Sequence, residues 1–118
     1  DTEPIGPKKL VDLMIVAPCT GNTLAKLACG ITDTPVTMAV KSSLRVGTPV
    51  VLAVATNDAL AASAQNIGRL LNTKHIFFVP MRQDDPEKKP SSLVCDFSQL
   101  LPTCLAALEG RQLEPVLL

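Results

Sequence analysis

Three short, dense apolar runs, each followed by a turn and a stretch of helical character, constrain the fold of this chain most strongly. The runs cover residues 11–18, 49–55 and 75–80, and they are apolar at most positions rather than at alternate ones. A strand with this pattern is buried on both faces, as in a parallel sheet whose two faces are covered by helices. We therefore expect an α/β fold with a parallel sheet, right-handed crossovers and helices on both faces.

Helix signals occupy the segments between these runs. Four helices are expected, over residues 23–29, 35–45, 59–71 and 98–108. Thr20 suits the cap of the first helix, Gly30 its end, and Pro35 the first turn of the second helix. The polar segment 81–92 contains two prolines and several charged side chains, so we expect it to be a surface loop.

Chain length and strand count bear on the domain organisation. A chain of 118 residues forms one domain at most, here 1–118. Three strands make a thin sheet, because sheets carry about five or six strands on average. The chain also begins in a polar stretch with proline and glycine, which is typical of a linker inside a domain. We therefore expect strands that precede this chain, so that the domain is incomplete at its N-terminus.

The composition excludes several classes of protein. Eleven basic and eleven acidic residues give no net charge, which argues against a nucleic-acid partner or an anionic membrane partner. The apolar runs are far shorter than the ~20 residues of a membrane span, and residues 1–4 lack the pattern of a signal peptide. Four cysteines without a C-x-x-C pair, and a single histidine, favour reduced thiols and no metal site. We expect a cytoplasmic protein.

Ligand-binding groups are expected at the carboxyl ends of the strands, where the loops of open α/β sheets feed into helices. That rule selects the segments 17–23, 55–58 and 80–89. The first segment is the richest, because it places small polar side chains and free backbone N–H groups at the start of a helix. Such a start suits an anion or the polar edge of a ring, and Gly21 allows a ligand to approach the backbone closely. The same residues also fit an ordinary helix-capping turn.

Residues 17–33, with the sequence APCTGNTLAKLACGITD, resemble the signature of the homo-oligomeric flavin-containing cysteine decarboxylase family. In that family a proline, small residues, Asn-Thr, Ala-Lys and a later Gly-Ile-x-Asp follow a strand in this order. The resemblance implies a three-layer Rossmann-like (flavodoxin-like) fold, FMN as the cofactor, and assembly into trimers or multiples of trimers. It also implies that Asn22 lies at the flavin and substrate site, with the backbone around Ala17, Pro18 and Thr20 lining the same pocket.

A second motif of this family is altered in the present chain. The family carries Pro-Ala-Met-Asn after the next strand, followed by Met and Trp, whereas this chain has Val54-Ala55-Thr56-Asn57 with Leu60 and Ala61. The asparagine is kept, and the residues that cover the family's substrate are not, which argues against decarboxylation of a cysteine adduct. The family's catalytic histidine precedes this region, so no catalytic residue is assigned. The cofactor-binding candidates are Ala17, Pro18, Thr20, Gly21, Asn22, Thr23 and Asn57.

Other segments are similar to the B-subunit family of dipicolinate synthases. They are TNDAL at 56–60, TKHIFFVP at 73–80, QDDPEKKP at 83–90 and LEPVLL at 113–118. The resemblance covers the whole of this chain but only the later portion of the family's chains. It implies the oxidation of dihydrodipicolinate or hydroxy-tetrahydrodipicolinate to dipicolinate in the mother cell of a sporulating bacterium. The companion, the dipicolinate synthase A subunit, would take the hydride onto NADP.

A dicarboxylate substrate needs cationic or N–H partners. Lys88 and Lys89 supply cations in the charged segment that we expect to be a loop. They join Asn22 and Asn57 as substrate-binding candidates. Alternatively, the two lysines are solvated surface charges, or they pair with the neighbouring acidic residues or with the companion subunit.

Two alternative functions come from different classes. The chain can be a non-catalytic scaffold that keeps the flavoprotein fold and stabilises the companion subunit, which fits the loss of the substrate-covering residues. It can also be a flavin-dependent decarboxylase, which fits the motif around Asn22. Full activity of the companion without this chain argues against the scaffold, and release of carbon dioxide from a peptidyl-cysteine substrate identifies the decarboxylase.

Overall fold

The computed structural model describes residues 12–118, so the expected start of the first strand at Val11 lies outside the described residues. Along the chain the elements are β1 (Met14–Cys19), α1 (Gly21–Cys29), α2 (Pro35–Arg45), β2 (Val50–Thr56), α3 (Ala64–Leu71), β3 (Ile76–Phe78), β4 (Met81–Asp85), β5 (Lys89–Cys95), the short 3-10 helix η1 (Phe97–Gln99) and α4 (Leu100–Leu108). Each of the three apolar runs in the sequence forms a strand, namely β1, β2 and β3.

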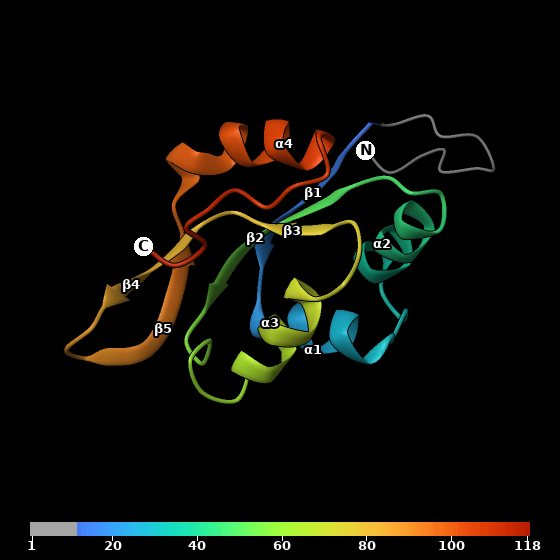
Figure 1. Cartoon of the computed structure of the whole chain (residues 1–118). Helices are drawn as coiled ribbons and strands as arrows, with labels where there is room; N and C mark the ends of the chain where they lie inside the picture. The colour runs from blue at the N-terminus through green and yellow to red at the C-terminus, as the bar shows by residue number, and fades with distance from the viewer. Residues whose placement is uncertain (1–11) are drawn as a thin grey trace.

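The sheet is built around β2, and helices cover both of its faces. Strands β1 and β3 flank β2 in parallel, with Val50 opposite Met14 on one side and opposite Ile76 on the other. Helices α1, α2 and α3 lie on one face and α4 lies on the other (Figure 1). The expected three-layer α/β arrangement is therefore confirmed. The sheet is mixed rather than wholly parallel, because β5 pairs with the end of β2 in the antiparallel direction.

The central position of β2 in the sheet explains why residues 50–55 are all apolar. Val50, Leu52 and Val54 belong to the core on the side of α1 and α3. Val51 and Ala53 belong to a second core on the side of α4. All five side chains are fully buried. Because alternate residues of a strand point to opposite faces, a strand covered on both faces has to be apolar at every position. Each valine or leucine buried in this way contributes about 1.5–3 kcal/mol of transfer free energy.

The segment 81–92, which we expected to be a surface loop, forms most of a β-hairpin made of β4 and β5. The hairpin projects from the body of the molecule (Figure 1). That prediction was wrong because such a hairpin buries few side chains and so shows little apolar pattern in the sequence. Met81, Leu93 and Cys95 are buried, while much of the rest is exposed and polar. The turn is closed by the amide of Lys88, which donates to the Asp85 carboxylate at 3.1 Å.

Helix α3 is shorter than the sequence predicts. The expected helix covered residues 59–71, whereas the structure has turns before Ala64. Hydrogen bonds hold this stretch in turns, because the backbone oxygen of Asp58 accepts from the amides of Ala61 and Ser63 at 3.0 Å each. The amide of Leu60 donates to the backbone oxygen of Ser91 at 2.9 Å, which ties the stretch to the hairpin. These tertiary bonds override the helical propensity of an alanine-rich sequence.

The C-terminal segment completes the sheet through one side chain and one short bridge. The side-chain amide of Gln112 accepts from the backbone N–H of Phe78 at 2.8 Å and donates to its backbone oxygen at 2.6 Å. It thereby takes the place of a neighbouring strand beside β3. Farther on, Leu117 forms a parallel bridge with Met81. Between residues 12 and 118, no helix is both long enough and apolar enough to cross a membrane.

Candidate functional site

A cavity of about 330 Å³ lies where β1 and β2 end. The three segments that the sequence selects all contribute to it, and β5 closes a further side. The residues that line the cavity are Thr20, Gly21, Ala55, Thr56, Asn57, Asp84, Ser92, Leu93 and Val94. Hydroxyl, amide and carboxylate groups thus meet at the carboxyl ends of two parallel strands, which is where open α/β sheets bind their ligands.

The start of α1 forms the first wall of the cavity. Thr20 has an extended backbone and caps the helix, with its hydroxyl accepting from the amide of Thr23 at 3.4 Å. The amides of Gly21 and Asn22 open the helix and have no acceptor inside it, as is general for the first turn. The helix dipole adds a partial positive charge at this end. This wall therefore favours a ligand atom that accepts hydrogen bonds.

Gly21 lies in close contact with the turn that follows β2. A Cβ atom at this position would come within 2.8 Å of Thr56 Oγ1, 3.1 Å of Asp58 Oδ1 and 3.2 Å of Ser63 Oγ. The first of these distances is shorter than real Cβ contacts, so a side chain here would displace the Thr56 hydroxyl and disturb its hydrogen bond to Asp58. The start of α1 can approach the turn because residue 21 is glycine.

Asp58 organises the turn on which Gly21 packs. Its Oδ1 accepts from the hydroxyl of Thr56 at 2.7 Å and from the hydroxyl of Ser63 at 2.8 Å. These two hydrogen bonds, from Thr56 and then Ser63, hold the pKa of Asp58 below its usual value. The carboxylate therefore stays ionised at neutral pH and fixes the turn. Asn57 lies within this turn, and its exposed side chain is presented to the cavity.

Sequence reasoning missed the roles of Asp58 and Ser63. A signal for them exists, since Thr-Asn-Asp directly after a buried strand is typical of a turn in which side chains hydrogen-bond nearby groups. The partner Ser63 was assigned to a helix, and the helix begins one residue later.

The β4–β5 hairpin forms the third wall of the cavity and contributes Asp84, Ser92, Leu93 and Val94. The pairing of β4 with β5 shifts its register between Gln83 and Asp85, so Asp84 lies at the irregularity. Such bulges re-aim side chains and are frequent beside functional sites. The sequence selected segment 80–89 for the ligand-binding edge, but as a loop, so it missed the part of this wall that β5 contributes. The sequence Asp-Pro-Glu-Lys at 85–88 is a turn signal that favours a hairpin here.

The predicted cofactor-binding residues divide into three groups. Thr20, Gly21 and Asn57 line the cavity. Asn22 and Thr23 follow on the first turn of α1, beside the cavity rather than on its lining, and Asn22 is exposed. Ala17 and Pro18 lie on β1, are both exposed and are joined by a cis peptide bond.

The two predicted substrate lysines belong to the hairpin. Lys88 lies in its turn and Lys89 begins β5 opposite Asp85. Both are exposed, and neither is among the residues that line the cavity. Lys89 lies close enough to the carboxylate of Asp84 to lower its pKa, although the Ser92 hydroxyl has the larger effect.

None of the cysteines lines this cavity, and neither does His75. All four cysteines are free thiols, and Cys19, at the end of β1, is fully buried. Burial raises the pKa of Cys19 to about 12, so its thiol stays protonated. His75 precedes β3 at the amino end of the parallel strands, which is the opposite end from the cavity. Within residues 12–118, no group of three or more His, Cys, Asp and Glu side chains is arranged to hold a metal ion.

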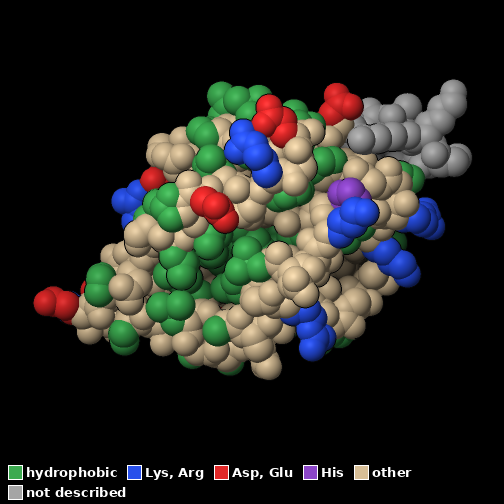
Figure 2. Space-filling view, viewed as in Figure 1, with side chains coloured by type: hydrophobic (Ala, Val, Ile, Leu, Met, Phe, Trp, Pro, Cys, Tyr) green, Lys and Arg blue, Asp and Glu red, His purple; other side chains and the backbone are tan. Residues whose placement is uncertain are grey.

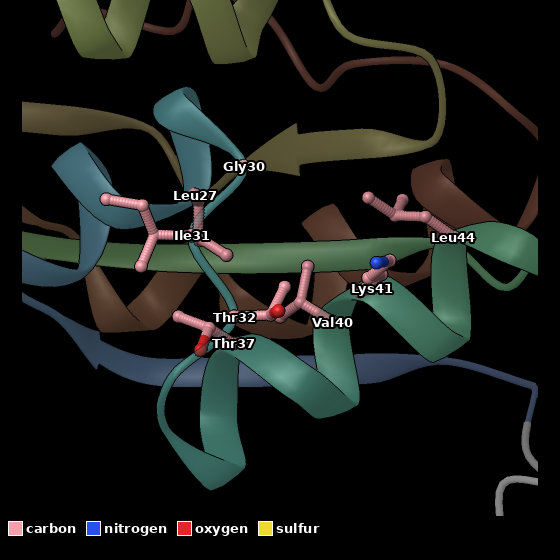
Figure 3. Close-up of a pocket in the computed structure, with 8 residues that line it drawn as sticks. All are labelled: Leu27, Gly30, Ile31, Thr32, Thr37, Val40, Lys41 and Leu44. Atoms are coloured by element: carbon pink, nitrogen blue, oxygen red, sulfur yellow. The ribbon is translucent and has the colours of Figure 1, made fainter.

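A second cavity, of about 200 Å³, lies between the end of α1 and helix α2 (Figure 3). It is lined mainly by apolar side chains, and its lining residues are Leu27, Gly30, Ile31, Thr32, Thr37, Val40, Lys41 and Leu44. The hydroxyl of Thr37 is already bonded to the hydroxyl and the backbone oxygen of Thr34, at 2.8 and 3.0 Å. The cavity therefore offers a ligand much less polar chemistry than the one at the strand ends.

An apolar groove of about 170 Å³ runs between α3 and the C-terminal segment. Figure 2 shows hydrophobic side chains gathered around a hollow beside α3 in the middle of this face. Leu60, Ile67, Met81 and Leu117 are among the residues that line it. Leu60 stands where the decarboxylase family has a substrate-covering methionine, and here it lines this groove instead of the cavity at the strand ends.

We predict opposite effects for two glycine-to-alanine substitutions. Gly21→Ala lowers the free energy of unfolding by about 1–3 kcal/mol, because its Cβ is forced against Thr56. Gly68→Ala, the matched control inside α3, meets no atom within 4 Å and raises it by about 0.5–1 kcal/mol. Urea denaturation of the two variants measures both changes. Equal stabilisation by both substitutions would show that Gly21 does not contact the turn.

We predict that the carboxyl of Asp58 titrates below the ordinary aspartate value of about 3.9. Because its pKa is lowered on folding, its contribution to stability is present above that value and is lost as the pH falls through the folded-state pKa. Ser63→Ala removes one donor and raises this pKa toward about 3.9. Carbon-13 NMR of the side-chain carboxyls follows the titration. Ser98→Ala is the control, because the Ser98 hydroxyl donates to Asp96 instead. A wild-type Asp58 that titrates at the ordinary value contradicts the network.

The sequence of this chain is similar to the sequences of two characterised proteins. The sequence is 50% identical to the dipicolinate synthase B subunit of Bacillus subtilis over 115 residues, which are 98% of this chain and 58% of that protein. It is 45% identical over 49 residues to the coenzyme A biosynthesis bifunctional protein CoaBC of Thermococcus kodakarensis, covering 42% of this chain and 12% of that protein. The sequence-based resemblance to dipicolinate synthase B subunits is thus confirmed.

The fold is also similar to those of two solved structures. The dipicolinate synthase B subunit from Bacillus halodurans superposes with a TM-score of 0.94 at 50% identity, covering 99% of this chain and 60% of that chain. The FMN-dependent cysteine decarboxylase SpaF superposes with a TM-score of 0.58 at 26% identity, covering 84% and 53% of the two chains. The present chain spans 58–60% of the length of the two B-subunit relatives. A family model described as Flavoprotein matches residues 1–108, and the chain belongs to this flavoprotein family.

Proposed function

We propose that this chain is the flavin-binding part of a dipicolinate synthase B subunit. In this proposal it takes part in the oxidation of dihydrodipicolinate or hydroxy-tetrahydrodipicolinate to dipicolinate in a sporulating cell. The observation that carries the proposal is 50% identity to the Bacillus subtilis B subunit across 98% of the chain. The cavity at the ends of β1 and β2 supports it, because it combines a helix start with a hydrogen-bonded turn at the usual ligand-binding edge of the fold.

The residues of the cavity fit the edge of a flavin ring. The pyrimidine edge of a flavin alternates carbonyl oxygens with an N–H group. The first amides of α1 and the hydroxyl of Thr20 are donors for the carbonyl oxygens, and the Asn57 amide supplies both a donor and an acceptor. The carboxylate of Asp84 accepts hydrogen bonds only, and suits the N–H group. Donors and acceptors on three walls thus match a ring that presents both.

The phosphate of FMN fits this cavity poorly. Among the described residues that line it, Asp84 is the charged one and no cation is present. A phosphate placed here would lie beside a carboxylate, which is unfavourable. We therefore assign the ring, and not the phosphate, to the described part of the chain. FMN remains the proposed cofactor, in agreement with what the name of SpaF says of that protein.

The chain's own residues would bind and orient the ring. When bound, a flavin exchanges two electrons with a partner, which is the class of chemistry that aromatises a dihydro ring. The helix dipole and the amides of α1 favour electron density on the carbonyl edge of the ring. Asp58 holds Asn57 in place through the turn, so the amide meets the ring without reorganisation.

A companion subunit completes the proposed reaction. Removal of a hydride and a proton from a dihydro dicarboxylate ring makes it aromatic and releases one electron pair. We propose NADP on the dipicolinate synthase A subunit as the final acceptor of that pair, and a flavin held by this chain would relay it. The 118 residues contain no G-x-G-x-x-G fingerprint for a dinucleotide, which supports assigning NADP to the companion. Assembly of this chain with copies of itself, as trimers or multiples, stays a prediction, as does its location in the cytoplasm of the mother cell.

A flavin-dependent decarboxylase is the second candidate, because the chain superposes on the FMN-dependent cysteine decarboxylase SpaF with a TM-score of 0.58. The positions that cover the substrate in that family argue against it. Leu60 lines the groove beside α3, and Ala61 is exposed. Release of carbon dioxide from a peptidyl-cysteine substrate would favour this candidate over the oxidoreductase.

We predict that the full-length protein, soaked in FMN and desalted, keeps a visible flavin absorbance band. Asn57→Ala is expected to weaken FMN binding by about 1 kcal/mol, roughly fivefold, because one hydrogen bond to the ligand is lost. Asn22→Ala tests the sequence-based prediction for a residue beside the cavity, and a similar loss would show that its side chain reaches the ligand. Asn72→Ala is the matched control, since Asn72 is exposed at the end of α3. Titration followed by flavin fluorescence measures the affinities.

The outcomes separate the alternatives. A wild-type protein that retains no flavin contradicts the flavin-binding role and favours a scaffold for the companion subunit. Normal flavin binding by both asparagine variants would remove these two residues from the site while leaving the flavin-binding role intact.

A further inference from the structure

We propose that Asp84 sets the ligand selectivity of the cavity, favouring an uncharged ring with an N–H donor and excluding a dicarboxylate. The inference rests on the proposed function for the identity of the ring. It adds that the dicarboxylate substrate is bound by groups outside this cavity, such as those of the companion subunit. The sequence placed Asp84 in the candidate segment 80–89 but did not name it among the binding residues.

The fold directs Asp84 toward the cavity. The residue lies at the register shift between Gln83 and Asp85, in a hairpin whose other strand extends from the end of β2. Ser92 and Leu93, across the hairpin from it, line the same cavity. On the opposite side are Thr20 and Gly21 at the start of α1. A ligand between these walls meets helix amides on one side and a carboxylate on the other.

The charge of the cavity is negative where a dicarboxylate would need positive charge. Among the described residues that line it, Asp84 carries the one formal charge. The Ser92 hydroxyl, with a smaller contribution from Lys89, keeps the pKa of Asp84 below its usual value, so the carboxylate is ionised at neutral pH. A second carboxylate, that of Asp58, lies directly behind Thr56. A dianionic ring placed here meets like charge, whereas a neutral ring N–H gains a charge-assisted hydrogen bond.

The two lysines of the hairpin, Lys88 and Lys89, do not make the charge of the cavity positive. Lys89 helps to lower the pKa of Asp84, but less than the Ser92 hydroxyl does, and Lys88 lies in the exposed turn. Neither contributes to the lining of the cavity. The dicarboxylate-binding role that the sequence suggested for these two lysines would therefore require a surface other than this cavity.

The test compares two ligands on the full-length protein and two matched variants. Riboflavin offers the uncharged ring without a phosphate, and pyridine-2,6-dicarboxylate offers the dianion. Asp84→Asn keeps the shape of the side chain and removes its charge. Glu87→Gln, in the exposed turn of the same hairpin, removes the same charge away from the cavity. Isothermal titration calorimetry gives the dissociation constant for each ligand.

We expect the two ligands to respond to Asp84→Asn in opposite directions. Riboflavin should bind about 5–10-fold more weakly, because a charge-assisted hydrogen bond becomes a neutral one. Pyridine-2,6-dicarboxylate should bind about two- to fivefold more tightly, because the repulsion from an exposed carboxylate is removed. Glu87→Gln should match the wild type for both ligands. A purely structural role for Asp84 would weaken the binding of both ligands together.

Several results would overturn the inference. They are changes in the same direction for both ligands, no change for either, and wild-type binding of the dicarboxylate as tight as that of riboflavin. The dicarboxylate arm stands apart from the proposed function. If the wild type binds no riboflavin, the flavin-binding role fails, while a gain in dicarboxylate affinity in Asp84→Asn still supports exclusion by Asp84.

Discussion

The approach of α1 to the turn after β2 is the contact on which the rest of the site depends. Gly21 makes it possible, because a Cβ would lie 2.8 Å from Thr56 Oγ1. Asp58 makes it specific, since its carboxylate holds the hydroxyls of Thr56 and Ser63 in the positions against which the glycine packs. Two elements far apart in sequence thereby become adjacent walls of one cavity. The same contact joins the helix amides to Asn57, which is the combination that a polar ring requires.

The strands give this contact its rigidity and the hairpin gives the cavity its chemical character. Strand β2 is buried on both faces and ends at Thr56, so the turn begins from a fixed point. Strand β5 continues the sheet at that end by pairing with Ala55 and Thr56. The hairpin then adds a carboxylate opposite the helix start. In this proposal the exposed β4–β5 hairpin determines which ligand the cavity selects, and the buried strand β2 fixes where the cavity lies.

Sequence patterns reveal the parts of the fold that local physics determines. Continuous apolar runs predict the three strands, and β2 and β3 are buried as expected, whereas β1 leaves Ile15, Ala17 and Pro18 exposed. Gly30, with a φ of 73°, ends α1 as expected. The hairpin escaped prediction because a ribbon that projects into solvent needs few apolar residues. The start of α3 was misplaced because Ser91 holds Leu60 in a turn through a bond that only the folded chain can make. For the same reason Gln112, which pairs with the backbone of Phe78, gives no sequence signal.

Hydrogen–deuterium exchange of the full-length protein with and without FMN tests the central claim most directly. The proposed position of the ring is between the start of α1, the end of β2 and the β4–β5 hairpin. It predicts slower exchange on FMN binding in the peptides that cover residues 20–24, 55–58 and 82–94, with little change elsewhere in residues 12–118. Protection confined to residues 27–44, which form the apolar cavity of Figure 3, or no protection while FMN is bound, would contradict it.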